Sequence, residues 1–335
     1  MIKYIVKRLA ISIIILLGVS VIIYSMVRLM PTDYVESKYS SQLQSGAMNP
    51  DDIAHFKELY GIGDNSFKGI VGGYLKWIGN LAKGDLGRSF KFEKPVGQVI
   101  TENMGISFMI AVIATILQFL ISIPLGISSA THQYSLRDYA VTFFTMVGLS
   151  LPTYFFAAIV VKIFSVDLGL FPPSGLKSAN ADFSPGFVGE VQQVLDMAHH
   201  LFLPIVVSVL LSIGGLMRYT RTNMLEVLNA DYIRTARAKG LSEKTVIYKH
   251  AFRNTMIPLV TMLAGILPSL FGGMMITEQV FGIDGIGNLA YKALREGDIP
   301  FVMGYNMFLA ILTVIGTLLS DIMYSVVDPR VKLGK

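Results

Sequence analysis

The sequence has no cysteine and little charge. None of its 335 residues is a cysteine, which excludes disulfide bonds, thiolate metal sites and thiol nucleophiles. Only 15% of the residues are charged, whereas 53% are hydrophobic, and the mean hydropathy is +0.57. This balance excludes an ordinary water-soluble domain and is typical of a membrane protein.

Six apolar runs of about 20 residues are each long enough to cross a hydrocarbon core of about 30 Å as a helix. The sequence therefore predicts an all-α membrane protein. The spans are expected near 9–29, 106–130, 139–161, 201–217, 257–277 and 301–320. The first run is too long for the core of a cleavable signal peptide, so residues 1–30 are expected to remain as a transmembrane helix.

The spans also lack charged residues near their centres. Arg28, Lys162, Glu278 and Asp321 fall at span ends, where a charged side chain is expected to meet headgroups or water. An ion-coupled secondary transporter or channel subunit usually carries such a charge within a span, so this alternative is weakened. It stays open because unwound backbone can coordinate ions.

Lysine and arginine are unevenly distributed between alternate loops. The segments 1–8, 131–138, 218–256 and 328–335 together hold fifteen, whereas the short loops 166–200 and 282–300 hold three. In membrane proteins, the short loops on the cytoplasmic side carry an excess of lysine and arginine. The distribution therefore predicts that both termini and the 218–256 loop are cytoplasmic. The 31–105 segment is then an extracytoplasmic cap, expected to contain at least one helix near Asp51 and Asp52.

Polar residues recur at helical spacing within three spans. Close helix packing explains any single stripe, but three together favour a polar pathway. The candidate pathway-lining residues are Thr115, Gln118, Ser122, Thr261, Ser269, Asn306 and Thr313. Glycine and proline interrupt the spans at "SIPLG", "GLSLPTY", "LFLPIV" and "GILPSLFGG", which is compatible either with bending helices or with structural kinks.

The basic stretch 231–256 predicts a short helix, a turn at Gly240 and a second helix that begins near Ser242. A DNA-binding helix-turn-helix is disfavoured because membrane spans tether both sides of this unit. The other chemical candidates, His199 and His200, point in different directions on a helix, so neither catalysis nor a metal site is expected. A docking element for a cytoplasmic partner explains the stretch better than a merely solvated basic face.

Five segments resemble one known family in order and spacing. "RTARAKG" followed by "HAFRNTMIP" is similar to the EAA loop of ABC-importer permeases, in the version of the oligopeptide and dipeptide importers. The other segments are "KRLAISIIILLGVSVIIYSMVRLMP", "GDLGRSF" with "PVGQVI", "ITEQVFGIDGIGNLAYKALREGDIPFVMG" and "DIMYSVVDPRV". One departure is Arg234, where the generic motif has glutamate, and the peptide-importer version commonly lacks that glutamate.

The resemblance implies a type I ABC-importer permease fold with six transmembrane helices, of which helices 2–6 form a core over 106–335. It implies a bacterial inner-membrane subunit that forms half of a peptide pathway with a second homologous permease, surrounded by membrane lipid. A cytoplasmic ATPase would bind the loop, and an extracytoplasmic solute-binding protein would deliver peptide. The residues implied in ATPase coupling are Arg234, Ala236, Arg237, Lys239 and Gly240.

The resemblance also implies that this chain is not itself an enzyme. It has no G-x-x-x-x-G-K-[ST] motif to cradle phosphates, so ATP is expected to bind only to partner subunits. No cofactor, metal or nucleic acid is expected to bind the chain.

Overall fold

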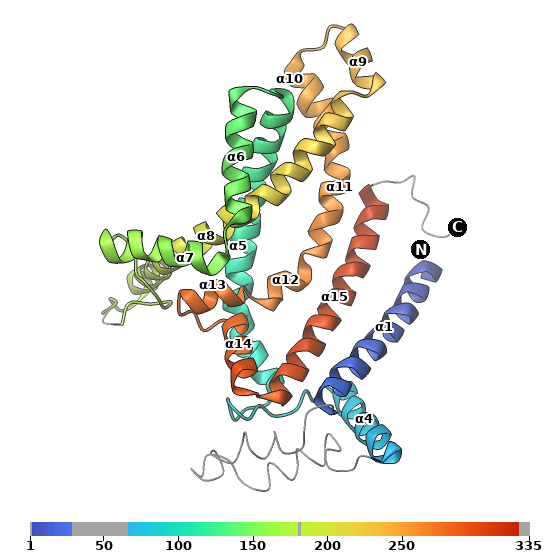
Figure 1. Cartoon of the computed structure of the whole chain (residues 1–335), viewed down its shortest axis with the longest axis vertical. Coiled ribbons are helices and arrows are strands. Elements are labelled where there is room, and N and C mark those ends of the chain that lie inside the picture. Colours follow the sequence, from blue (N-terminus) through green and yellow to red (C-terminus); the bar gives the residue numbers. More distant parts are fainter. Residues whose placement is uncertain (1, 29–65, 180–181, 328–335) are drawn as a thin grey trace. The chain divides into compact units, whose positions relative to one another are not determined.

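The computed structural model describes residues 2–28, 66–179 and 182–327, and within these ranges its regular secondary structure is helical, apart from an isolated β-bridge between Arg88 and Pro95. Figure 1 shows the helices along the chain. They are α1 Ile2–Arg28, α4 Phe67–Ala82, α5 Val96–Thr131, α6 Leu136–Ser150, α7 Thr153–Val160, the π-helix η1 Val161–Asp167, α8 Phe187–Leu228, α9 Asp231–Ala238, α10 Glu243–Thr245, the π-helix η2 Val246–Ala251, α11 Phe252–Gly265, α12 Leu267–Gly272, α13 Met275–Val280, α14 Ile286–Glu296 and α15 Ile299–Val327.

Four helices are long and apolar enough to cross a membrane within the described part of the chain. They are α1, α5, α8 and α15, which confirms the predicted helices near 9–29, 106–130, 201–217 and 301–320. The helix predicted at Asp51 and Asp52 lies outside the described residues. Two predicted spans depart from a straight helix.

The span predicted at 139–161 is bent at Pro152. The helices on either side, α6 and α7 with η1, differ in direction by 105°. Proline disfavours the helical conformation of the residue before it, and Leu151 accordingly adopts an extended backbone with φ −83° and ψ 130°. The two helices together are apolar and long enough for one bent span, and the interruption predicted at "GLSLPTY" is confirmed.

The span predicted at 257–277 is divided among α11, α12 and α13. Gly273 has φ +73° and ψ 164°, a conformation that strongly favours glycine, and it separates α12 from α13. By contrast, Pro124 and Pro204 lie inside the continuous helices α5 and α8. Of the four predicted interruptions, only the two at Pro152 and at "GILPSLFGG" break a helix.

The chain divides into two compact units. The first comprises Met1–Met104 with Leu289–Leu318 and Leu333–Lys335, and the second comprises Gly105–Asn288 with Leu319–Lys332. In the first unit, the buried residues Tyr24, Trp77, Ile299, Met303 and Met307 form one core cluster.

A loop between α4 and α5 is held to the start of α15 in the first unit. The carboxylate of Asp298 accepts hydrogen bonds from the backbone N–H groups of Phe90, at 3.3 Å, and Lys91, at 3.1 Å, and from the Ser89 hydroxyl. It also accepts from Phe301 N at 3.2 Å, which caps α15. Asp298 thus positions a segment about 200 residues away in sequence.

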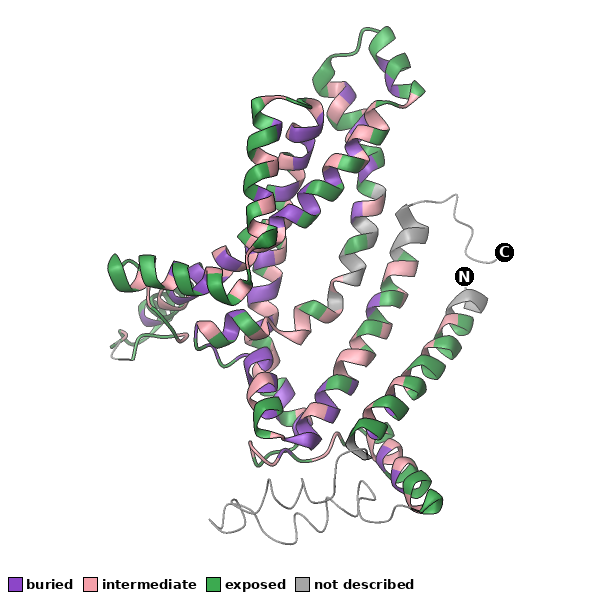
Figure 2. Ribbon diagram, in the orientation of Figure 1, coloured by how far each residue is buried: buried purple, intermediate pink, exposed green. Residues whose placement is uncertain are grey.

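The second unit is built on close contacts of α8 with its neighbours. A Cβ at Gly148 of α6 would lie 2.8 Å from the Leu210 carbonyl oxygen, and one at Gly214 of α8 would lie 2.5 Å from the Thr145 carbonyl oxygen. In a membrane the hydrophobic effect does not drive helices together, so helix association depends on close packing, which small residues permit. Figure 2 shows the burial along these helices.

Candidate functional site

The predicted docking element forms a short helix packed on the ends of longer helices. Ile233 and Ala236 are the buried residues of α9, and Ile233 has no exposed surface. They belong to a core cluster that includes Ile127 of α5, Met224 of α8 and Val246 of η2. Since these side chains come from four elements, the position of α9 is mechanically linked to α5, α8 and η2.

Gly240 makes the turn that follows α9. Its φ is +74°, the left-handed region in which a Cβ is strained, and its N–H donates to the Arg237 carbonyl at 2.9 Å. The Leu241 N–H donates to the Ala236 carbonyl at 3.4 Å, so the turn satisfies carbonyls at the helix end. Ser242 then accepts a hydrogen bond from Thr245 N and caps the next helix. The predicted helix, glycine turn and second helix are confirmed.

The outward face of α9 is polar and basic. Arg234, Lys239 and Gly240 are exposed, whereas Ala236 is only 6% exposed and faces the core. Arg237 is exposed but its Nε lies 2.9 Å from Oε1 of Glu243, which ties the helix to the segment after the turn. Of the five predicted coupling residues, four are therefore on the surface and Ala236 sits beneath them.

The helix after the turn leads back into the bundle. From Glu243 to Gly265 the helical elements α10, η2 and α11 follow one another without a gap. The Thr255 hydroxyl of α11 lies 3.2 Å from the Met224 sulfur of α8. A displacement of the 231–254 segment would consequently reach both α8 and α11.

The predicted pathway-lining residues are divided between the two units. In the second unit, Ser122 is fully buried and donates to the Ile213 carbonyl at 3.2 Å, and Gln118 donates to the Ser212 carbonyl at 3.0 Å. Both contacts join α5 to α8, as expected for helix packing. Thr115 is half-buried and Ser269 is exposed. The side chain of Thr261 lies outside the described residues.

Asn306 and Thr313, in the first unit, are exposed on α15. Each side chain donates to the carbonyl four residues earlier, Asn306 to Val302 at 2.7 Å and Thr313 to Leu309 at 2.8 Å. Thr317, one turn further along α15, is exposed as well, and its hydroxyl donates to the Thr313 carbonyl at 2.8 Å. Their role in a pathway stays a prediction, as does that of the residues in the second unit.

The environment of Glu278 differs from the one predicted from the sequence. This side chain was predicted to meet headgroups or water, but it is only 1% exposed. Its carboxylate accepts hydrogen bonds from the Ser107 hydroxyl at 2.7 Å, Met274 N at 3.0 Å and Asn288 N at 2.9 Å. The Ser107 oxygen in turn accepts from Ile286 N at 2.8 Å. The carboxylate thus holds the 282–288 turn against α13 and α5.

Glycines make room for this carboxylate. A Cβ at Gly285 would lie 2.5 Å from Oε2 of Glu278, and one at Gly287 would lie 3.0 Å from the same atom. Sequence reasoning missed this cluster, although the glycines of "EQVFGIDGIG" around an acid were a visible signal. They gave no indication of Ser107, which is 171 residues away.

A second buried carboxylate was also missed. Asp138 lies at the start of α6 and is only 3% exposed. Its carboxylate accepts hydrogen bonds from Nε of Arg221 at 3.0 Å and from Nη2 of the same arginine at 2.9 Å. The Ser129 hydroxyl and Tyr134 N add further hydrogen bonds. This bidentate ion pair holds the turn between α5 and α6 against α8. Its two residues lie close in sequence to members of the core cluster on which α9 packs.

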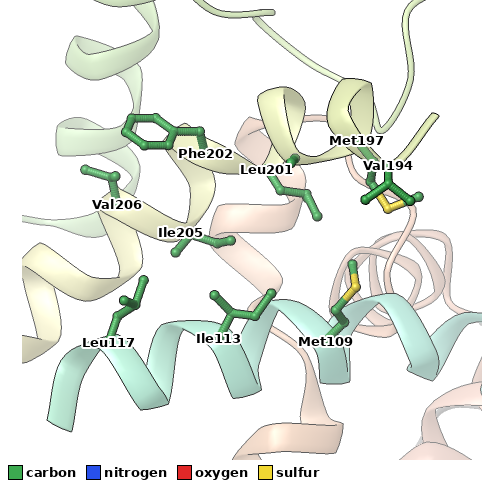
Figure 3. A pocket seen from close by; sticks show the side chains of 10 residues that line it. Met109, Ile113, Leu117, Val194, Met197, Leu201, Phe202, Ile205 and Val206 are labelled. Carbon is green, nitrogen blue, oxygen red and sulfur yellow. The ribbon is translucent and has the colours of Figure 1, made fainter. Parts of the chain in front are cut away.

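An apolar pocket of about 400 Å³ lies between α5 and α8 (Figure 3). Met109, Ile113 and Leu117 approach it from α5, and Phe202 and Ile205 from α8. It offers apolar side chains only, so it has no group to bind a peptide backbone. Within the described residues, no cluster of three histidine, aspartate or glutamate side chains could hold a metal ion.

The fold is shared with a solved membrane transporter. The chain superposes on an inward-facing structure of the MetNI methionine ABC transporter with a TM-score of 0.51, at 16% identity, covering 69% of this chain and 97% of that one. The architecture is therefore that of a type I ABC-importer permease. Residues 122–333 match the family described as binding-protein-dependent transport system inner membrane component.

Curated relatives cover almost the whole chain. The oligopeptide transport system permease protein AppB of Bacillus subtilis (strain 168) is 37% identical over 333 residues, 99% of this chain and 100% of that protein. The dipeptide transport system permease protein DppB of Alkalihalophilus pseudofirmus is 31% identical over 341 residues, 99% of this chain and 100% of that protein.

A putative peptide transport system permease protein of Brucella abortus (strain 2308) is 33% identical over 328 residues, 98% of each chain. The chain belongs to the family of binding-protein-dependent transport system inner membrane components and is a multi-pass membrane permease subunit.

Proposed function

We propose that the chain is the permease subunit of a peptide importer, and that α9 receives the force of ATP hydrolysis from a separate cytoplasmic ATPase. The relatives named for oligopeptide, dipeptide and peptide transport support peptide as the substrate class. The observation that carries the coupling role is the seating of α9, with a buried apolar face on the bundle and a basic face in solvent.

The proposal assigns different tasks to the coupling residues. Arg234 and Lys239 contact the ATPase because they project from the outer face. Ala236 keeps α9 close to the bundle, and Gly240 and Arg237 hold the turn to the next helix. ATP binds only to the partner subunits, and this chain carries no catalytic residue.

The orientation and the remaining partners complete the proposal. Both termini and the α9 turn lie in the cytoplasm, as the distribution of lysine and arginine indicates. A second homologous permease forms the other half of the pathway, and an extracytoplasmic solute-binding protein delivers peptide. When the ATPase subunits close on nucleotide, α9 tilts α8 and α11 so that access alternates between the two sides.

Charge reversal on α9 tests this function. The chain is expressed with its candidate second permease, ATPase and binding protein, purified, and reconstituted into vesicles for ATP-dependent uptake of labelled peptides. In the Arg234→Glu, Lys239→Glu double variant we expect the ATPase subunits to be lost during purification and uptake to fall at least tenfold.

Lys177→Glu is the matched control, since it is an exposed lysine in the loop before α8 and should leave both readouts unchanged. Full ATPase retention in the double variant would refute docking at α9. Peptide uptake by the chain without any ATPase would instead favour the ion-coupled carrier, for which the comparisons give no support.

A further inference from the structure

Helix α4 carries two adjoining apolar faces, and α1 covers only one of them. Gly73 and Trp77 are buried, and Tyr74 packs on Tyr24 of α1 at 5.6 Å between ring centroids. Phe67 and Leu75 remain 83% and 60% exposed, with Val71 between them at 39%. These three residues recur every four positions and therefore form one continuous strip along the helix.

Lysines border the exposed strip. Lys68 and Lys76 each follow a residue of the strip in sequence, which places them on its flank, and Lys83 lies on the same side just after the helix. All three are exposed, and the segment 67–83 contains no acidic residue. An apolar strip beside a cationic flank matches a surface of hydrocarbon bordered by phosphate groups.

The contact with α1 sets the depth of α4. The Tyr74 hydroxyl lies 2.8 Å from the Ser20 hydroxyl, and the apolar window of α1 ends at Met26. Six residues at 1.5 Å per residue place that contact about 9 Å inside the end of the apolar stretch. Interfacial helices bury their apolar face about 5–10 Å below the headgroups, so α4 lies at the corresponding level.

Aromatic residues at this level support the same placement. Tyr24, Tyr74 and Trp77 gather at one end of α1, and tyrosine and tryptophan are enriched where the hydrocarbon meets the headgroups. The exposed surface of α1 is itself apolar, with Ile14 68% and Ile22 59% exposed. Exposed apolar side chains are therefore a feature of both α1 and α4.

We propose that α4 is an interfacial membrane helix, whose Phe67, Val71 and Leu75 insert among lipid acyl chains while Lys68 and Lys83 contact phospholipid phosphates. The occupant is the bilayer leaflet at the C-terminal end of α1. This assignment is independent of the proposed substrate and of the ATPase. Docking of another protein on the same strip is the competing outcome.

The single tryptophan of the chain makes a direct test available. In a Trp77→Phe background, Phe67→Trp or Leu75→Trp places a fluorescent reporter on the strip. Gly72→Trp places one on the polar flank, at a position where a Cβ meets no atom within 4 Å. The full chain, purified without partner subunits so that the reporter is the only tryptophan in the sample, is reconstituted in phosphatidylcholine–phosphatidylglycerol vesicles whose acyl chains are brominated near the carbonyl end.

We expect bromolipid to quench the reporters at 67 and 75 several-fold more than the reporter at 72, and aqueous iodide to show the reverse order. Two reporters on the strip keep the test valid if one variant does not fold. Iodide quenching at 67 and 75 without bromolipid quenching would overturn the proposal. Equal bromolipid quenching at all three positions would also overturn it, because the helix would then have no water-facing flank.

Discussion

Gly240 is a single residue on which the shape of the α9 turn depends. Its φ of +74° lies in the left-handed region, but open space surrounds the position of an added Cβ. Substitution is therefore opposed by backbone conformation rather than by a clash. Asparagine enters this region more readily than other residues, whereas proline has φ near −65° and no N–H to donate to Arg237.

We expect Gly240→Asn to keep most of the ATP-dependent uptake and Gly240→Pro to lose at least tenfold, although both chains insert in the membrane. The measurement is peptide uptake in vesicles normalised to inserted protein, with ATPase activity recorded in parallel. Equal uptake by the two variants would show that the turn has no part in coupling.

Glu278 shows the cost of removing a buried acceptor. Glu278→Ala would leave the Ser107, Met274 and Asn288 donors without a partner. Each unsatisfied buried group costs about 1–3 kcal/mol, so we expect the free energy of unfolding to fall by roughly 3 kcal/mol or more. Thermal unfolding of the purified protein measures the loss, and Glu190→Ala, at an exposed glutamate of α8, is the control. Equal midpoints for the two variants would contradict this role.

Because the carboxyl of Asp298 is buried, we expect the stability of the first unit to depend on pH. Burial raises the pKa of this carboxyl above its ordinary value, although hydrogen bonds from Ser89 and the nearby backbone act in the opposite direction. The folded state then binds the proton more tightly than the unfolded state does. The stabilising contribution is complete below the ordinary pKa of about 4 and is lost as pH rises through the raised value.

We expect wild type to lose stability relative to Asp298→Asn as pH rises through that window, since asparagine does not titrate. Thermal unfolding of both proteins between acidic and neutral pH checks this sign. A difference that does not change with pH, or that grows in favour of wild type as pH rises, would contradict it.

At the scale of elements, α9 transmits motion only if it stays seated on the bundle. Ile233→Glu places a charge in a position with no exposed surface, whereas Ile233→Val keeps an apolar side chain there and leaves the outer face of α9 unchanged. We expect the first variant to lose peptide uptake while the ATPase still turns over. The second should retain coupled transport.

The informative measurement is the ratio of peptide transported to ATP hydrolysed, for each variant reconstituted with its partners. Similar ratios for Ile233→Glu and Ile233→Val would show that burial of α9 is unnecessary for coupling.

The helices and turns also show which parts of the fold can be predicted from sequence patterns. Apolar length predicted six helices, of which four are continuous in the described part of the chain, and the glycine turn with its Ser242 cap was predicted from local chemistry alone. Proline was less informative, because Pro152 ends a helix whereas Pro204 lies within one. Whether a helix continues through proline depends on neighbouring helices, which periodicity does not describe. The Glu278 cluster was missed for the same reason, since Ser107 is remote in sequence.

At the scale of the whole molecule, the absence of cysteine provides a test of orientation. Thr235→Cys on α9 and Gln193→Cys near the start of α8 are both exposed single sites. In right-side-out vesicles we expect a membrane-impermeant maleimide to label position 193 and not 235, and in inverted vesicles the reverse. Labelling of both from one side, or the opposite pattern, would refute the proposed topology.

Helix α8 runs for 42 residues, from Phe187 to Leu228, without interruption. At 1.5 Å per residue its length is about 63 Å, roughly twice the hydrocarbon thickness. The helix is continuous along this length, although Pro204 within it removes one backbone hydrogen bond. If α8 moves as one body, a tilt that opens the pathway at one end closes it at the other, and a pathway open at both ends would require α8 to bend, for which Pro204 is the weakest position.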